Sequence, residues 1–280
     1  MDYLDFPLME WTNRFIDHWL IPVFGPFFDT ISDYISYLLK WFETILLWFP
    51  PEVLMLVFAA AIWRVAGKGV ALLSCAGFVY IGSVGLWDET MQTMAIILSA
   101  TVLSLVCGIP IGVLCAKSDK FNQFVRPLLD AMQTMPSFVY LIPTILLFGI
   151  GSVPAVISTF IFAMPPAVRL TNLGIRQVPE DVVEASQAFG STGWQILRKV
   201  ELPLARSSIL AGVNQTIMMA LSMAVIASMI GSGGLGSVVL TGITRVNVGL
   251  GLEAGLAIVF LAVILDRVTQ SMGQRQRPQL

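Results

Sequence analysis

EASQAFGSTGWQILRKVELP, residues 184–203, is a polar, charged segment that lies between long apolar stretches. The helix that contains it is expected to begin after Pro179, with acidic residues in its first turns and basic residues near the end of the segment, as the helix dipole favours. Gly190 and Gly193 predict a turn between two short amphipathic helices, and Pro203 is expected to end the second one. The sequence therefore predicts a helix pair outside the bilayer, with one face on its own membrane domain and the other free for a partner.

The composition is that of an all-α polytopic membrane protein. Of its 280 residues, 56% are hydrophobic and 12% are charged, and the mean hydropathy is +0.80; soluble domains carry about 25% charged residues. A net charge of −2 without a basic block argues against nucleic-acid binding. No nucleophile and base, and no cluster of metal ligands, can be recognised, so we expect neither catalysis nor a metal site.

Seven membrane spans are predicted, and their ends are uncertain by several residues. They cover residues 45–63, 69–87, 91–116, 130–151, 153–170, 206–230 and 248–266. Of the 16 Lys and Arg residues, all but Arg14, Lys40 and Arg245 lie in alternate connections and the C-terminal tail. This bias predicts a cytoplasmic C-terminus and helix pair, and an N-terminus outside the cell. No ionisable residue lies near the middle of a span, which argues against an ion-driven carrier and suggests that energy comes from another subunit.

Three regions follow from this pattern. Residues 1–44 form an extracytoplasmic amphipathic tail, residues 45–270 form the membrane domain with the loop 180–203, and residues 271–280 form a cytoplasmic tail. Within the first region we expect two helices along the membrane surface, separated by the breaker run at residues 22–26. These helices could equally be packing struts on the spans or a functional scaffold.

Prolines interrupt the fourth and fifth spans, and such breaks are tolerated where a neighbour or an aqueous path satisfies the freed carbonyls. Mildly polar residues on spans four and six are candidates for the wall or gate of a pathway, although ordinary helix packing explains them as well. These candidates are Gln133, Met135, Phe138, Tyr140, Asn214, Met218 and Ser222. The glycine-rich run at residues 230–236 lacks the strand and Gly-Lys-Ser/Thr end of a phosphate-binding loop. It predicts instead a re-entrant turn or close backbone packing at the outer mouth.

The loop also resembles the EAA motif of the membrane subunits of ATP-binding-cassette (ABC) importers. Glu184, Ala185, Gly190, Leu202 and Pro203 match that motif in register, while Ser186 and Val200 replace its second Ala and its Ile. Four further stretches resemble the permease subunit of glycine betaine, proline betaine and choline importers: residues 132–143, 148–154, 165–175 and 230–236. The resemblance covers about residues 45–270.

This resemblance implies a type I ABC importer fold, with a quaternary-amine osmoprotectant as the transported solute. Its implied partners are two copies of an ABC ATPase, which bind ATP and Mg²⁺, an extracytoplasmic substrate-binding protein, a second permease chain and membrane lipid. No cofactor is expected in this chain, and its location would be the bacterial cytoplasmic membrane. The residues implied to contact the ATPase are Glu184, Ala185, Ser186, Gln187, Phe189, Gly190, Leu202 and Pro203. Two alternatives stay open: a similar importer for another solute, such as methionine or an alkylsulfonate, and a channel or carrier that needs no ATPase.

Overall fold

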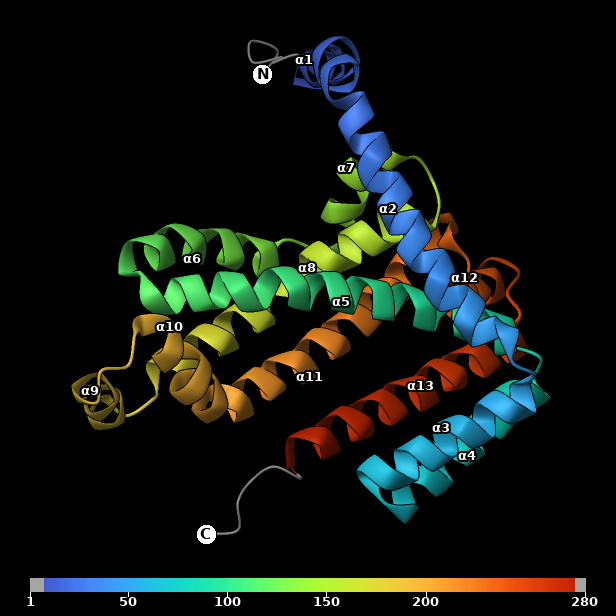
Figure 1. Cartoon of the computed structure of the whole chain (residues 1–280). Coiled ribbons are helices and arrows are strands. Elements are labelled where there is room, and N and C mark those ends of the chain that lie inside the picture. Colours follow the sequence, from blue (N-terminus) through green and yellow to red (C-terminus); the bar gives the residue numbers. More distant parts are fainter. Residues whose placement is uncertain (1–7, 275–280) are drawn as a thin grey trace.

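The computed structural model describes residues 8–274, and every regular element in that part of the chain is a helix (Figure 1). The α-helices are α1 (Leu8–Phe15), α2 (Ile21–Trp48), α3 (Pro51–Ala66), α4 (Lys68–Ser83), α5 (Trp87–Lys117), α6 (Asp119–Thr134), α7 (Ser137–Phe148), α8 (Ser152–Arg176), α9 (Glu180–Ala188), α10 (Gly193–Ile196), α11 (Leu202–Ala227), α12 (Leu235–Thr244) and α13 (Val248–Gln274). Three π-helical turns join some of them: η2 (Ile16–Leu20), η3 (Leu197–Glu201) and η4 (Ser228–Ser232). The predicted tails at residues 1–7 and 275–280 lie outside the described residues.

Helix α8 lies between α5 and α11 and packs against both along its length. Small residues bring the backbones together: a Cβ added at Gly112 of α5 would lie 2.7 Å from both Thr171 Cβ and the Val168 carbonyl oxygen of α8. A Cβ added at Gly174 would lie 2.7 Å from Ser208 Cβ of α11. Because lipid is as apolar as leucine, such close van der Waals packing is what holds membrane helices together.

Four of the predicted spans coincide with long apolar helices, and three do not. Within residues 8–274, Trp87–Lys117, Ser152–Arg176, Gly193–Ser232 and Val248–Ser271 are long and apolar enough to cross a membrane. The predicted spans 45–63 and 130–151 fall on helix pairs bent by 101° and 100°, so the described residues hold up to six spans if each pair counts as one. The predicted span 69–87 falls on α4, which has only 16 residues.

Prolines cause both bends. Phe49 and Pro50 are extended, with ψ of 142° and 144°, and Met135 before Pro136 has ψ of 135°. The residue before a proline is driven out of the helical region, so each apolar run of adequate length becomes two helices in different directions. By contrast, Pro110, Pro165 and Pro166 lie inside helices that continue through them.

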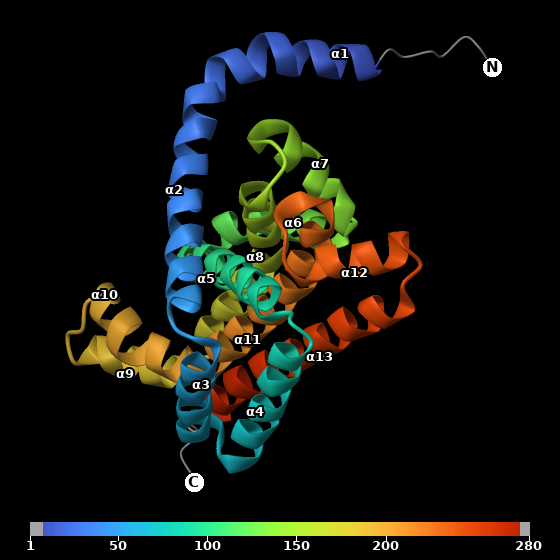
Figure 2. The same cartoon turned by 90° about the vertical axis from the view of Figure 1, so that its right-hand side faces the viewer.

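The N-terminal arm corrects one prediction. The expected break at residues 22–26 is wrong, because α2 continues from Ile21 to Trp48 and contains Pro26. Pro22 sits in the first turn, where a missing N–H is tolerated, and the carbonyl that Pro26 leaves free belongs to Pro22 itself. Figure 2 shows the arm changing direction between α1 and α2, where the π-helical turn η2 lies.

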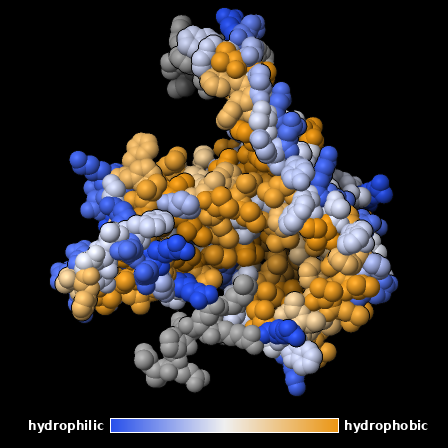
Figure 3. Space-filling model, in the orientation of Figure 1, coloured by the Kyte–Doolittle hydropathy of each residue, from blue (hydrophilic) through white to orange (hydrophobic). Residues whose placement is uncertain are grey.

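The two ends of the bundle differ in character. Figure 1 places α9 and α10 at one end of α5, α8 and α11, and α12 at the other. In the space-filling view, apolar residues cover the middle of the molecule, and hydrophilic side chains gather over the α9 and α10 end (Figure 3). The helix pair therefore stands beyond the apolar part of the protein.

Candidate functional site

Helix α9 is a short helix that the body of the protein leaves almost uncovered. None of its residues is buried, and only Val183 and Ser186 are half-buried. The helix starts after Pro179, with Glu180 and Asp181 in its first turn, where acidic side chains interact favourably with the positive end of the helix dipole. These features confirm the sequence prediction for the start of the segment.

Gly190 ends α9 in a left-handed turn. Its φ is +80°, its N–H donates to the Gln187 carbonyl at 2.8 Å, and the Ser191 N–H donates to the Ser186 carbonyl at 3.1 Å. These two bonds form a Schellman motif, which favours glycine because residues with a Cβ are disfavoured at positive φ. No atom lies within 4 Å of a Cβ added at Gly190, so the backbone angle, not internal crowding, requires glycine here.

The second helix of the pair begins with a capping box and does not stop where the sequence predicted. Thr192 Oγ1 accepts from the Gln195 N–H at 3.4 Å, and the Thr192 N–H donates to Gln195 Oε1 at 2.8 Å. From Gly193 the chain continues through η3 and α11, so the expectation that Pro203 ends the helix is wrong. Pro203 is the second residue of α11 and lies just after the π-helical turn η3, which interrupts the regular ladder of α-helical hydrogen bonds, so the missing N–H of proline is tolerated there.

A salt bridge ties this second helix to the end of α5. Lys117 Nζ lies 2.5 Å from Glu201 Oε2 and donates to Glu201 Oε1 at 2.7 Å. Glu201 is only 6% exposed. Leu202 packs beside this pair on a small apolar cluster formed by Ile175, Leu197 and Ala205. The base of α11 is therefore fixed to α5 and α8 by both charge and packing.

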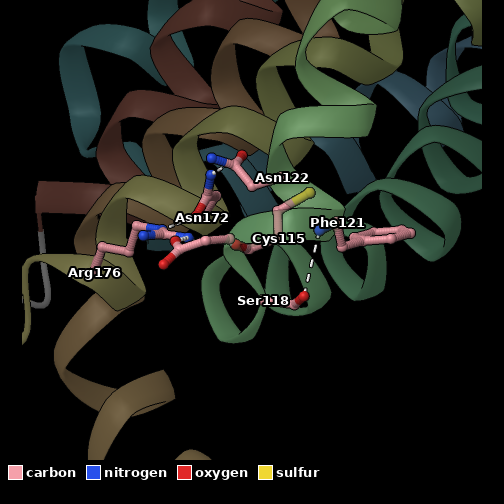
Figure 4. Close-up of polar contacts among 7 residues, drawn as sticks. Cys115, Ser118, Phe121, Asn122, Asn172 and Arg176 are labelled. Carbon is pink, nitrogen blue, oxygen red and sulfur yellow. Dashed lines mark hydrogen bonds and ion pairs between the residues drawn. The ribbon is translucent and has the colours of Figure 1, made fainter.

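Arg176 connects the end of α8 to α5 and α6 through hydrogen bonds. Its guanidinium donates to Asp119 Oδ1 at 2.6 Å, to the Cys115 carbonyl at 2.8 Å and to Asn172 Oδ1 at 2.8 Å. Asn172 in turn donates to Asn122 of α6 at 2.9 Å (Figure 4). The ends of α5, α6 and α8 thus form one hydrogen-bonded unit beneath α9.

A polar hollow of about 340 Å³ separates α9 from that unit. Its lining includes Lys117 and Arg176 from the body, Glu184 and Gln187 from α9, and the buried Glu201. On the remaining surface of the pair, Phe189 is 92% exposed and Trp194 is 68% exposed. Large apolar side chains at such exposure, on a helix that few contacts hold, are typical of a surface that a partner covers.

Comparison with known proteins agrees with this geometry. The family described as "Binding-protein-dependent transport system inner membrane component" matches residues 108–278, which include α9 and the whole of the bundle core from the middle of α5 onward. The chain belongs to this family. It is therefore a multi-pass membrane permease subunit of a transport system and not an enzyme.

Several relatives match almost the whole permease chain. The glycine betaine/proline betaine transport system permease protein ProW of Escherichia coli (strain K12) is 48% identical over 271 residues, which is 97% of this chain and 76% of that protein. The glycine betaine transport system permease protein OpuAB of Bacillus subtilis (strain 168) is 47% identical over 97% of this chain and 96% of its own. In fold, the permease is similar to a chain of the MetNI methionine ABC transporter, with a TM-score of 0.60, 23% identity, and coverage of 65% of this chain and 92% of that chain.

The pathway candidates on α6 and α7 lie around the bend of the permease. Tyr140 is 6% exposed, and its hydroxyl donates to the Met132 carbonyl, across the break between the two helices. Met135 and Phe138 are exposed, and Gln133 is half-buried. Tyr140 therefore stabilises the bend, while Met135 and Phe138 present their side chains outward.

The candidates on α11 lie on one side of that helix. Asn214 Oδ1 accepts from Thr269 Oγ1 of α13, Met218 is half-buried, and the exposed Ser222 donates to the Met218 carbonyl at 3.1 Å. No hydrogen bond among the described residues joins this group to the one on α6 and α7. The structure thus gives Asn214 a partner within the chain and leaves Ser222 at the surface.

Sequence reasoning missed Lys117, Glu201 and Arg176 because nothing in the sequence shows which charges of two distant connections meet. It also missed the capping box, which Thr192-x-x-Gln195 does signal. The glycine-rich run behaves as predicted: the Gly234 N–H donates to Gln92 Oε1 at 3.0 Å, and a Cβ added at Gly234 would lie 2.5 Å from Thr93 Oγ1. Close backbone packing is confirmed as one reason for these glycines.

Proposed function

We propose that this chain is the permease subunit of an ATP-driven ABC importer for a quaternary-amine osmoprotectant: glycine betaine, proline betaine or choline. The observation that carries the substrate class is identity of 44–48% over 97% of the chain with three permeases named for glycine betaine, from Escherichia coli, Bacillus subtilis and Listeria monocytogenes. A trimethylamine N-oxide permease of Pelagibacter ubique (strain HTCC1062) is also similar, at 44% identity over 76% of this chain. All these solutes carry a methylated nitrogen.

The helix pair α9 and α10 is the docking site for the ATPase. Its exposed Phe189 and Trp194 supply apolar anchors, and the hollow lined by Glu184 and Gln187 allows α9 to shift against the body. One ATPase docks under each of two permease chains, and ATP and Mg²⁺ bind in the ATPase. This arrangement assigns the coupling role to residues 184–190 and to Leu202 and Pro203.

Transport follows from relative movement of the two permease chains. ATP binding closes the ATPase pair and draws the two helix pairs together. Because the helix that starts at Gly193 continues through η3 and the whole of α11 and kinks only at Ile230 and Gly231, a pull on its base moves the whole of α11. The Lys117–Glu201 bridge carries the same pull to α5, so the bundle rocks as a unit and opens outward to accept solute from the binding protein.

The orientation follows the charge bias, with α9 and the C-terminus in the cytoplasm of a bacterium and the N-terminus outside. The N-terminal region 1–44 lies at the outer surface of the cytoplasmic membrane. Exposed Trp11, Trp19, Tyr34, Tyr37 and Trp41 support this placement, because tryptophan and tyrosine favour the membrane interface. The exposed Met135, Phe138 and Ser222 remain the pathway candidates, with Gln133, Tyr140, Asn214 and Met218 behind them.

The test is uptake of radiolabelled glycine betaine into vesicles that contain this chain, its ATPase and its binding protein, with and without ATP. We expect uptake that depends on both ATP and the binding protein, and competition by unlabelled proline betaine or choline. Uptake without the ATPase would favour a carrier or channel. An assembled, ATP-hydrolysing complex that takes up methionine or an alkylsulfonate in place of betaine would retain the importer and overturn the substrate class.

A further inference from the structure

A second polar cavity, of about 260 Å³, lies at the end of the bundle away from α9. Four segments line it: α2 with Leu39 and Glu43, α5 with Gln92, α8 with its first residue Ser152, and the run 231–233. Gln92 and Lys117 belong to the same helix, so the rise of an α-helix places the two cavities roughly 37 Å apart. In the proposed orientation this cavity lies on the side where the binding protein delivers solute.

The wall formed by the glycine-rich run is held in place. Gly231 and Gly233 have φ of +98° and +76°, and a Cβ added at Gly233 would lie 2.8 Å from Gln92 Oε1. The Leu235 N–H donates to Thr93 Oγ1 at 2.9 Å, next to the bond between Gly234 and Gln92. Side chains on α5 therefore fix the backbone of this wall, and the positive φ at positions 231 and 233 favours glycine there.

Two polar groups at the cavity have no partner among the residues that the structure describes. Ser232 is 8% exposed, and its Oγ makes no hydrogen bond, although its carbonyl accepts from Ser152 Oγ at 3.3 Å. Glu43 is half-buried and takes part in none of the ion pairs or side-chain hydrogen bonds among residues 8–274. A buried hydroxyl and a partly buried carboxylate without partners both cost free energy that a bound polar ligand would recover.

The charges on the two helices that face the cavity are opposite. Glu43 on α2 supplies a carboxylate, and no Lys, Arg or His of residues 8–274 lines the cavity to neutralise it. Ser152 begins the 25-residue helix α8, whose N-cap Gly151 offers no side-chain hydrogen bond, so the positive end of that helix lies at the cavity. A negative group on one wall and an anion-binding helix end on another are complementary to a molecule that carries both charges.

We propose that this cavity is a binding subsite for a small zwitterion on the permease itself, with the cationic nitrogen toward Glu43 and the carboxylate toward the first turn of α8 and Ser232 Oγ. The volume of about 260 Å³ lies just below the roughly 300–1,000 Å³ of typical small-molecule pockets, which suits a small solute of the size of glycine betaine. This inference rests on the proposed function and deepens it: the cargo meets an oriented site in the permease after it leaves the binding protein.

The test measures equilibrium binding of radiolabelled glycine betaine to the permease–ATPase complex in lipid nanodiscs, without the binding protein. We expect saturable binding that Glu43→Gln weakens at least tenfold, Ser232→Ala weakens severalfold, and Glu43→Asp partly retains. Glu52→Gln is the matched control, because Glu52 is an exposed carboxylate of the neighbouring helix α3 that does not line the cavity, and it should leave binding unchanged. Choline, which has the cation without the carboxylate, should compete much more weakly than unlabelled betaine.

Three outcomes would overturn the inference. Equal binding by wild type and the assembled Glu43→Gln complex would remove Glu43 from the site, and if that variant fails to assemble, equal binding by Ser232→Ala and Glu43→Asp decides in the same way. Displacement of the label by sodium or potassium chloride, as compared with an uncharged osmolyte at equal osmolality, would make the cavity an inorganic cation site. Absence of betaine binding in a complex that still performs ATP-dependent betaine uptake would refute this subsite alone, whereas absence of uptake would refute the proposed function.

Discussion

Lys117 Nζ at the end of α5 lies 2.5 Å from Glu201 Oε2 at the base of α11, and the two residues differ sharply in exposure: 43% of the lysine side chain but only 8% of the glutamate side chain is accessible. The two residues that the bridge joins are 84 positions apart in the sequence. The proposed docking segment comes shortly before Glu201 in the sequence, and the bridge connects Glu201 to α5. The bridge therefore lies on the route by which movement of α9 reaches the bundle.

The unequal burial predicts unequal effects of removing each partner. Lys117→Met leaves a buried carboxylate without a countercharge, which we expect to cost about 2 kcal/mol after screening of the exposed lysine is considered. Glu201→Gln leaves a lysine that can turn to water, so its cost should be smaller, about 1 kcal/mol. Thermal unfolding of the purified chain in detergent should rank wild type, Glu201→Gln and Lys117→Met in falling order of stability.

The double variant Lys117→Met/Glu201→Gln provides the control. Because it removes both charges, it should be more stable than Lys117→Met alone. If the double variant is as destabilised as the sum of the two single variants, the two charges do not interact, and the bridge has no role in stability.

Gly190 allows the effect of backbone conformation to be separated from that of side-chain size. At φ of +80° alanine is strained by about 1 kcal/mol, whereas asparagine tolerates the left-handed region much better. If the Schellman turn is what coupling requires, ATP-dependent uptake should fall in the order glycine, asparagine, alanine. The reverse order of the two variants, with the larger asparagine worse, would show that the ATPase packs directly on this position, since no atom of the described residues lies within 4 Å of a Cβ added at Gly190.

The packing of α5 on α8 predicts a specific sensitivity at Gly112. A methyl group there would lie 2.7 Å from the Val168 carbonyl oxygen, which cannot move without the helix. Gly112→Ala should therefore destabilise the chain by about 1–3 kcal/mol, the usual range for overpacking. Gly255→Ala on α13 is the matched control, because no atom lies within 4 Å of its added Cβ and alanine is the better helix former. A melting temperature equal to that of wild type for Gly112→Ala would contradict the close approach of the two helices.

The sequence predicted the parts of this fold that depend on local chemistry. Long apolar runs became α5, α8, α11 and α13, and the polar segment became a helix pair with its turn at Gly190, because hydropathy and glycine act over a few residues. Phe49–Pro50 and Met135–Pro136 bend their spans by about 100°, a consequence of proline that hydropathy alone does not reveal. Pro26 and Pro203 do not break their helices. The carbonyl that Pro26 leaves without a donor belongs to Pro22 near the start of α2, and Pro203 lies at the start of α11, just after the π-helical turn η3.

What the sequence could not show are the contacts between distant residues. Lys117 meets Glu201, Arg176 meets Asp119, and Glu43 faces the cavity beside Ser232, yet each of these residues alone reads as an ordinary polar residue in or near the end of a helix. Their pairing depends on how α2, α5, α8 and α11 cross in space. No periodicity within one segment carries that information.

Phe189 and Trp194 provide the most direct test of the proposed docking surface. Both side chains are largely exposed, at 92% and 68%, so Phe189→Ala and Trp194→Ala should leave the melting temperature of the isolated chain close to that of wild type. Anchors of this kind typically contribute 2 kcal/mol or more to an interface, so each variant should weaken ATPase association by roughly 30-fold or more in a pull-down titration. Phe124→Ala is the matched control, because Phe124 is 76% exposed on α6, outside the helix pair, and should leave association unchanged. Normal ATPase binding by both Phe189→Ala and Trp194→Ala would mean that these exposed rings contact lipid or a second copy of the chain, and that the ATPase is held by the polar face of α9.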